Sequence, residues 1–148
     1  MKKTIPISSL ALALLAACNS GNNTDAEINQ LREEAIAVHD EIMPQISVFD
    51  RNALKIDSLL SNMPQVKATH ADVDTAQARV ELTALKDRLE QATDAMMEWM
   101  SGFDVDPQDK TAAAAKAYYE SEVDKVQKLK QVFDEVAKES ADKLAPFQ

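Results

Sequence analysis

Apolar side chains recur at alternating steps of three and four residues through most of the chain after residue 24. The first series starts at Ile28, and its heptad spacing is typical of one long amphipathic helix. Thr24 or Asp25 can cap the start of this helix, and Pro64 marks its expected end. The positions reached after Ile28 are Leu31, Ala35, Val38, Ile42, Gln45, Phe49, Asn52, Ile56, Leu59 and Met63, and all but Gln45 and Asn52 are apolar.

Pro44 interrupts this first series. A proline inside a helix removes one backbone hydrogen bond and clashes with the preceding turn. We therefore expect a kink in the helix near residues 40–43. The alternative is a full break at Pro44, which would divide the helix and produce a fourth one.

A second series predicts a helix that Thr69 or Asp72 can cap. Gly102 weakens its end, as is usual for a glycine at a helix C-terminus. Every position of the series is apolar: Leu82, Leu85, Leu89, Ala92, Met96, Trp99 and Phe103.

A third series predicts a helix that starts at Asp106 and Pro107, a capping residue followed by a proline in the first turn. Pro146 ends the helical part of the chain. The series reads Ala112, Ala115, Tyr119, Glu122, Val126, Leu129, Phe133 and Val136, with Glu122 as its one polar interruption.

Three helices of about 30–38 residues joined by short turns predict an all-α fold. We expect an antiparallel, up-down-up three-helix bundle with long coiled-coil-like helices, and four helices if Pro44 breaks the first. The chain has only 2 glycines in 148 residues, which agrees with long helices.

The N-terminus has the layout of a secretory signal peptide. Lys2 and Lys3 precede a mostly apolar run over residues 5–15, which is shorter than the roughly 20 residues that span a bilayer. The run ends in Leu15-Ala16-Ala17-Cys18, and Cys18 is the only cysteine. This stretch resembles the bacterial lipobox. We therefore assign residues 1–17 to a lipoprotein signal peptide, residues 18–24 to a lipidated cysteine and flexible tether, and residues 25–148 to the helical domain.

The lipobox resemblance implies that the Cys18 thiol is joined to diacylglycerol and that cleavage makes Cys18 the first residue of the mature protein. Two or three acyl chains, such as palmitate, give stable membrane attachment. The next residue is Asn19 and not aspartate, which by the enteric sorting rule implies the outer membrane. The leaflet that the domain faces stays open.

The mature chain is strongly acidic. Residues 1–17 contain two lysines and no acids, so the charge after cleavage is 14 − 25 = −11. Such a surface argues against nucleic acid as a partner. The sequence contains no G-x-G-x-x-G, P-loop, H-E-x-x-H or paired C-x-x-C motif. No nucleophile–base pair is evident either, so we expect no enzymatic activity.

Two short clusters stand out, "HDEIMP" (39–44) and "MMEWM" (96–100). In an antiparallel hairpin that pairs Asn62 with Asp72, His39 lies level with Met96. Pairing Phe103 with Pro107 across the second turn would place Ala92 level with Tyr118. One layer of the bundle would then hold both clusters and a tyrosine.

This layer suggests a soft-metal site. Thioether and imidazole ligands suit Cu(I), and Trp99 can stack on a bound cation. The candidate ligands are His39, Met43, Met96, Met97 and Met100. The alternative is that the methionines and Trp99 are ordinary core residues. A weaker candidate for a divalent ion is His70-x-Asp72-x-Asp74.

Both clusters, with the aromatic residue that follows the second, resemble a family of small Bacteroidota lipoproteins that carry the automatic label "viral A-type inclusion protein". The family has no established activity, so the resemblance implies only that the two clusters belong together.

The sequence therefore predicts a non-enzymatic, lipid-anchored lipoprotein of the cell envelope. Its helices would form an interaction or structural module that self-associates or receives a partner helix. No cofactor is expected in this interpretation. The alternative is a periplasmic copper-binding protein that uses the His/Met cluster.

Overall fold

The computed structural model describes residues 20–148, with side chains from residue 24 onward. The range predicted to be a signal peptide (residues 1–17), Cys18 and Asn19 lie outside the described residues. Within the described range all regular structure is helical and no strand occurs, which confirms the all-α class. The elements are α1 (Ser20–Ser61), α2 (Met63–Thr69), α3 (Thr75–Gly102), α4 (Ala112–Leu144) and a 3₁₀ turn, η1 (Ala145–Phe147).

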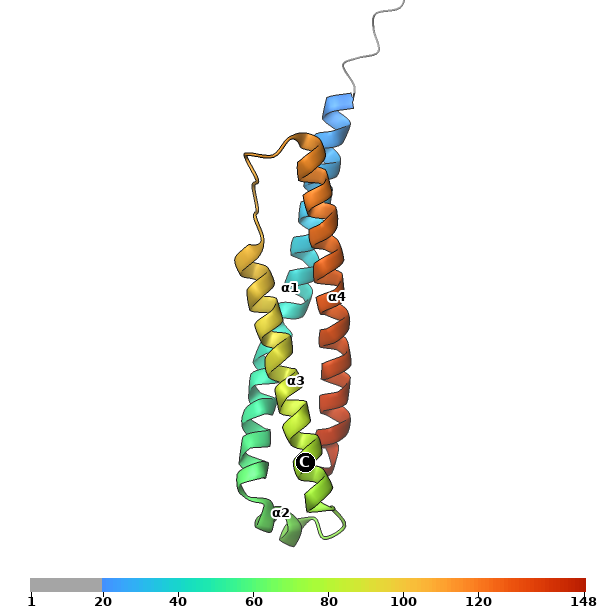
Figure 1. Cartoon of the computed structure of the whole chain (residues 1–148). Helices are drawn as coiled ribbons and strands as arrows, with labels where there is room; N and C mark the ends of the chain where they lie inside the picture. The colour runs from blue at the N-terminus through green and yellow to red at the C-terminus, as the bar shows by residue number, and fades with distance from the viewer. Residues whose placement is uncertain (1–19) are drawn as a thin grey trace, which may run out of the picture.

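The three long helices lie side by side in an elongated molecule (Figure 1). The chain descends through α1, reverses at α2, rises through α3 and descends again through α4. The long helix α1 therefore runs parallel to α4 and antiparallel to α3. None of the helices in the described range is long and apolar enough to cross a membrane.

The first helix differs from the prediction at both ends, and the alternative of a break at Pro44 is wrong. It begins at Ser20, about one turn before Thr24, and so includes part of the range assigned to the tether. It continues through Pro44 without a break, which the solvent-exposed position of this proline permits. The additional helix is α2 instead, which carries Pro64 in its first turn, where a missing backbone N–H costs nothing.

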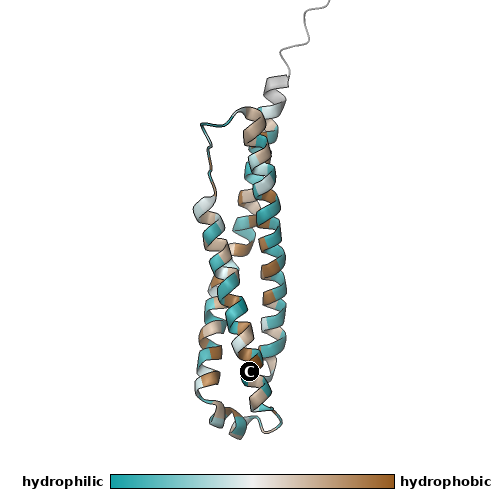
Figure 2. Cartoon of the chain, in the orientation of Figure 1, coloured by the Kyte–Doolittle hydropathy of each residue, from teal (hydrophilic) through white to brown (hydrophobic). Residues whose placement is uncertain are grey.

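The heptad pattern of α1 corresponds to a narrow buried stripe. Every seventh residue from Ala35 is buried, namely Ala35, Ile42, Phe49 and Ile56, and Met63 of α2 continues the series. The alternating positions, such as Leu31 and Leu59, are partly buried at the margin of the core. Figure 2 shows apolar residues recurring along each long helix, as expected for helices that share one continuous core.

The stripe of α1 packs against α4 through stacked aromatic rings. The centroids of Phe49 and Phe133 lie 4.9 Å apart, and both side chains are almost completely buried. The core polar contact between these helices is a hydrogen bond of 2.7 Å, in which Asn52 Nδ2 donates to Ser140 Oγ. Asn52, a polar exception in the predicted series, is thereby satisfied.

The start of α4 was predicted wrongly. Residues 103–111 form a connection, and α4 begins at Ala112, with Thr111 Oγ1 accepting from Ala114 N as the N-terminal cap. The Asp106-Pro107 pair has capping chemistry, but the Asp106 carboxylate accepts from Gln108 Nε2 within the connection and caps no helix.

The longer connection changes the alignment of α3 with α4. Arg88 of α3 pairs with Glu139 of α4. Tyr118 lies beside the connection, where its hydroxyl accepts from Asp104 N at 2.6 Å. The prediction that Tyr118 is level with Ala92 is therefore wrong, and Glu122 and Lys125 lie near Trp99 instead.

Candidate functional site

A row of aromatic rings crosses the end of the bundle next to the 103–111 connection. Trp99, in the last turn of α3, lies 5.7 Å from the His39 ring of α1 and 4.8 Å from the Phe103 ring, centroid to centroid. Phe103 in turn lies 6.1 Å from Tyr119 of α4. The Tyr119 hydroxyl donates to Val105 O at 2.8 Å, which ties the connection to α4. Trp99 thus stands where all three long helices meet.

On one side of Trp99 lies a small hollow of about 250 Å³, which we call the α1–α3 hollow. Its lining is Ile36, His39, Asp40, Trp99, Met100, Phe103 and Val105. The structure therefore brings His39, Trp99 and Met100 of the predicted soft-metal cluster around one space.

His39 is oriented by its neighbour in the chain. Its Nδ1 lies 2.9 Å from Asp40 Oδ1. Because an ionised carboxylate only accepts, Nδ1 carries the proton and Nε2 of a neutral ring has a free lone pair. Nε2 is buried and has no hydrogen-bond partner in the described part of the chain. A histidine fixed by a carboxylate on one nitrogen and open on the other is the usual arrangement of a metal ligand.

The other predicted ligands do not line the α1–α3 hollow. Met96 is completely buried in the core, and Met43 packs against that core. Met97 is 52% exposed. The placement of Met96 and Met43 follows the alternative interpretation, in which methionine fills gaps between helices.

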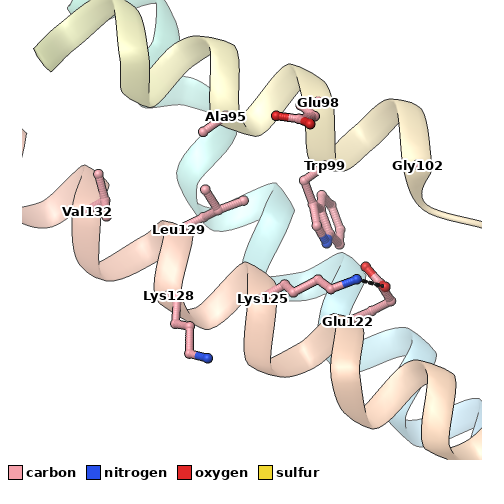
Figure 3. A pocket seen from close by; sticks show the side chains of 9 residues that line it. All are labelled: Ala95, Glu98, Trp99, Gly102, Glu122, Lys125, Lys128, Leu129 and Val132. Atoms are coloured by element: carbon pink, nitrogen blue, oxygen red, sulfur yellow. Dashed lines mark hydrogen bonds and ion pairs between the residues drawn. The ribbon is translucent and has the colours of Figure 1, made fainter.

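On the other side of Trp99 lies a larger depression between α3 and α4, which we call the α3–α4 groove (Figure 3). Its volume is about 550 Å³. Ala95, Glu98, Trp99 and Gly102 of α3 form one wall, and Glu122, Lys125, Lys128, Leu129 and Val132 of α4 form the other.

Glu122 places a carboxylate in the wall of the groove with only 5% of its side chain exposed. Lys125 Nζ donates to Glu122 Oε1 at 2.7 Å (Figure 3). This hydrogen bond is the main reason that the pKa of Lys125 is raised above its ordinary value. The Lys125 side chain is 58% exposed, so this carboxylate depends on a partner that is largely in water.

The indole nitrogen of Trp99 is also buried, and it has no hydrogen-bond partner among the described residues. Figure 3 shows this nitrogen directed from α3 toward the Lys125 and Glu122 side chains of α4. An indole N–H can only donate. Buried donors of this kind are almost always satisfied in native structures, so an unpaired one marks a place where an acceptor belongs.

The predicted His70/Asp72/Asp74 site is wrong. Between residues 24 and 148 no group of three or more His, Cys, Asp or Glu side chains is placed to hold a metal ion. Asp74 Oδ1 instead accepts from Ala76 N and Gln77 N as the cap of α3. His70 packs at the edge of the Phe147 ring, 6.0 Å between centroids.

Sequence reasoning identified His39, Met100 and Trp99 but missed the α3–α4 groove. It treated Glu122 only as a polar interruption of an apolar series. A charged residue at a position that must face the core was the available signal, because carboxylates are rarely buried without a partner.

Comparisons of this chain with protein-family models, with curated proteins and with solved structures find no match.

Proposed function

We propose that the protein is a non-enzymatic, lipid-anchored lipoprotein of the cell envelope whose helical domain, an up-down-up bundle of three long helices, is a binding module. The lipobox sequence around Cys18 supports the anchor. The resemblance of the two motifs to Bacteroidota lipoproteins agrees with it.

The single observation that carries a binding role is the α3–α4 groove. A purely structural bundle has no need of a buried carboxylate and an unpaired indole donor that line the same groove. Both groups cost stability unless something else satisfies them. Their position in an open, mostly apolar depression is typical of a binding site.

The anchor is tested by Cys18→Ser. We expect the variant to accumulate as uncleaved precursor and to incorporate no radiolabelled palmitate. Asn19→Asp is the matched variant for sorting: it should still be lipidated but should fractionate with the inner membrane. Palmitate labelling of the Cys18→Ser protein would overturn the lipobox assignment.

The binding role is tested separately by site-specific cross-linking in the envelope. A photoreactive residue at Lys128, on the rim of the groove, should capture a molecule that the same residue at Lys138 does not. Both lysines lie on α4, and Lys138 is 79% exposed and does not line the groove. Equal capture at the two positions would contradict the proposal.

A second candidate function is Cu(I) binding in the α1–α3 hollow. The observation in its favour is the free, buried Nε2 of His39, with Met100 in the same lining. His39 and Met100 would provide a nitrogen and a sulfur ligand, and Trp99 would cover the cation.

Titration with Cu(I) against a competing chelator tests this candidate. His39→Ala and Met100→Leu should each abolish one-to-one binding. Met96→Leu is the control because Met96 is in the core and does not line the hollow. Binding that survives His39→Ala would rule out this site.

A further inference from the structure

The α3–α4 groove has an apolar half and a polar half. Ala95, Leu129 and Val132 lie together at one end (Figure 3). Trp99, Glu122 and Lys125 gather at the other. The volume of about 550 Å³ lies within the range of about 300–1,000 Å³ typical of small-molecule sites. An occupant must therefore be a molecule with an apolar body and one polar end.

The polar half requires an acceptor. Trp99 Nε1–H has no partner in the described part of the chain and can only donate. Lys125 Nζ has three hydrogens, and the contact with Glu122 Oε1 uses one of them. An oxygen placed between α3 and α4 at this end can accept from both groups.

The position of Lys125 favours a negatively charged oxygen. Figure 3 shows its ammonium group beside the indole, whereas that of Lys128 is directed away from α3. In Figure 3 the Glu98 carboxylate lies along α3, away from the indole nitrogen. A negatively charged oxygen at this end of the groove can accept from the unpaired Trp99 N–H and from the Lys125 ammonium group. Charge-assisted hydrogen bonds are about twice as strong as neutral ones.

We propose that the α3–α4 groove binds a free fatty acid of medium chain length. The carboxylate accepts from Trp99 Nε1 and Lys125 Nζ. The acyl chain lies along Ala95, Leu129 and Val132. This inference rests on the proposed binding role and is independent of the lipid anchor and of copper.

The experiment uses the full-length chain in phosphatidylcholine vesicles and a photoactivatable analogue of laurate. After irradiation, peptide mapping should place the label on residues 95–102 and 122–132. Unlabelled laurate should compete. Methyl laurate, which keeps the chain but loses the charge, should compete about tenfold less well. Label placed mainly outside these two segments would overturn the proposal, as would stronger competition by dodecyltrimethylammonium than by laurate.

Two variants test the geometry. Trp99→Phe keeps an aromatic ring but removes the N–H, and it should weaken laurate competition about tenfold. Gly102→Met fills the groove from a position whose added Cβ meets nothing within 4 Å, so the fold tolerates it. It should abolish labelling of the groove.

Ser101→Met is the matched control for Gly102→Met. Ser101 is exposed, adjacent in the chain and absent from the lining of the groove. We expect the Ser101→Met variant to be labelled in the groove as strongly as the unmodified protein. Full labelling of Gly102→Met, or unchanged laurate affinity in Trp99→Phe, would show that the fatty acid does not occupy the groove as described.

Discussion

Replacing Glu122 by leucine should leave the protein at least as stable as before. The side chain is 5% exposed, and its only ion pair within residues 24–148 is with Lys125, which is 58% exposed. Solvent screening limits what such a pair contributes to about 1 kcal/mol or less. Burying a leucine side chain contributes about 1.5–3 kcal/mol relative to leaving it in water. Because the groove is open, we expect only part of that gain, about 1 kcal/mol in the free energy of unfolding.

Lys125→Ala should have the opposite effect and lower the free energy of unfolding. It leaves the Glu122 carboxylate in the wall without its hydrogen bond, and an unsatisfied buried acceptor costs about 1–3 kcal/mol. Water in the groove reduces this cost, so we expect a loss of about 1–2 kcal/mol. In the Glu122→Leu background, Lys125→Ala should cost almost nothing, because there is no carboxylate left to satisfy. The double-mutant cycle therefore isolates the pair.

Urea unfolding measured by far-ultraviolet circular dichroism gives the four free energies. Trp99 fluorescence is a second probe, since the chain has 1 tryptophan. If Glu122→Leu lowered the free energy of unfolding by about 2 kcal/mol or more, the carboxylate would be a structural element of the bundle. The argument that it is retained for binding would then fail.

Three further predictions concern the body of the bundle. Phe133→Ala removes a fully buried ring stacked 4.9 Å from Phe49 and should lower the free energy of urea unfolding by about 3–5 kcal/mol; a loss below about 1 kcal/mol would contradict the packing of α1 on α4. Pro44→Ala restores a backbone donor inside a continuous helix and should raise the same free energy by as much as about 3 kcal/mol, whereas a decrease would mean that the proline shape is needed. Burial raises the pKa of Tyr118 and Tyr119 above their ordinary value. The contribution of the two neutral phenols to the free energy of unfolding is therefore complete below pH ~10 and is lost as the pH rises through their folded-state pKa values. Phenolate absorbance should therefore appear at higher pH in the folded chain than in urea, and coincident titration curves would refute the burial.

The helices were predictable because heptad spacing requires only that one face of each helix be apolar. All the positions predicted for the second helix are buried except Phe103, which is partly buried. The start of the third helix was not predictable from local chemistry. Asp106 followed by Pro107 is a good start for a helix, but Thr111 is an equally good cap, and tertiary contacts decide which of the two starts is used. The contact from Tyr119 to Val105 O holds residues 103–111 out of a helix.

Glu122 marked an unusual position, but the location of the groove could not be predicted because it depends on where α4 begins. An α4 beginning at residue 107 would place different residues opposite Trp99. Only with α4 beginning at Ala112 do Glu122 and Lys125 face the indole. The α1–α3 hollow depends on the turn through α2. The sequence placed both ends of this turn close to their observed positions, so it brought His39 and the second cluster together correctly.

Trp99 lines both the α1–α3 hollow and the α3–α4 groove, so its fluorescence alone cannot assign a ligand to either one. The chemistry of the two spaces separates them. The groove requires the indole N–H, whereas the hollow requires the lone pair of His39 Nε2 and only the face of an aromatic ring. Trp99→Phe should therefore weaken laurate about tenfold and leave Cu(I) affinity within about a factor of three, while His39→Ala should abolish Cu(I) binding and leave laurate unchanged. Loss of laurate binding in His39→Ala would mean that the two spaces act as one site and that neither assignment stands in its present form.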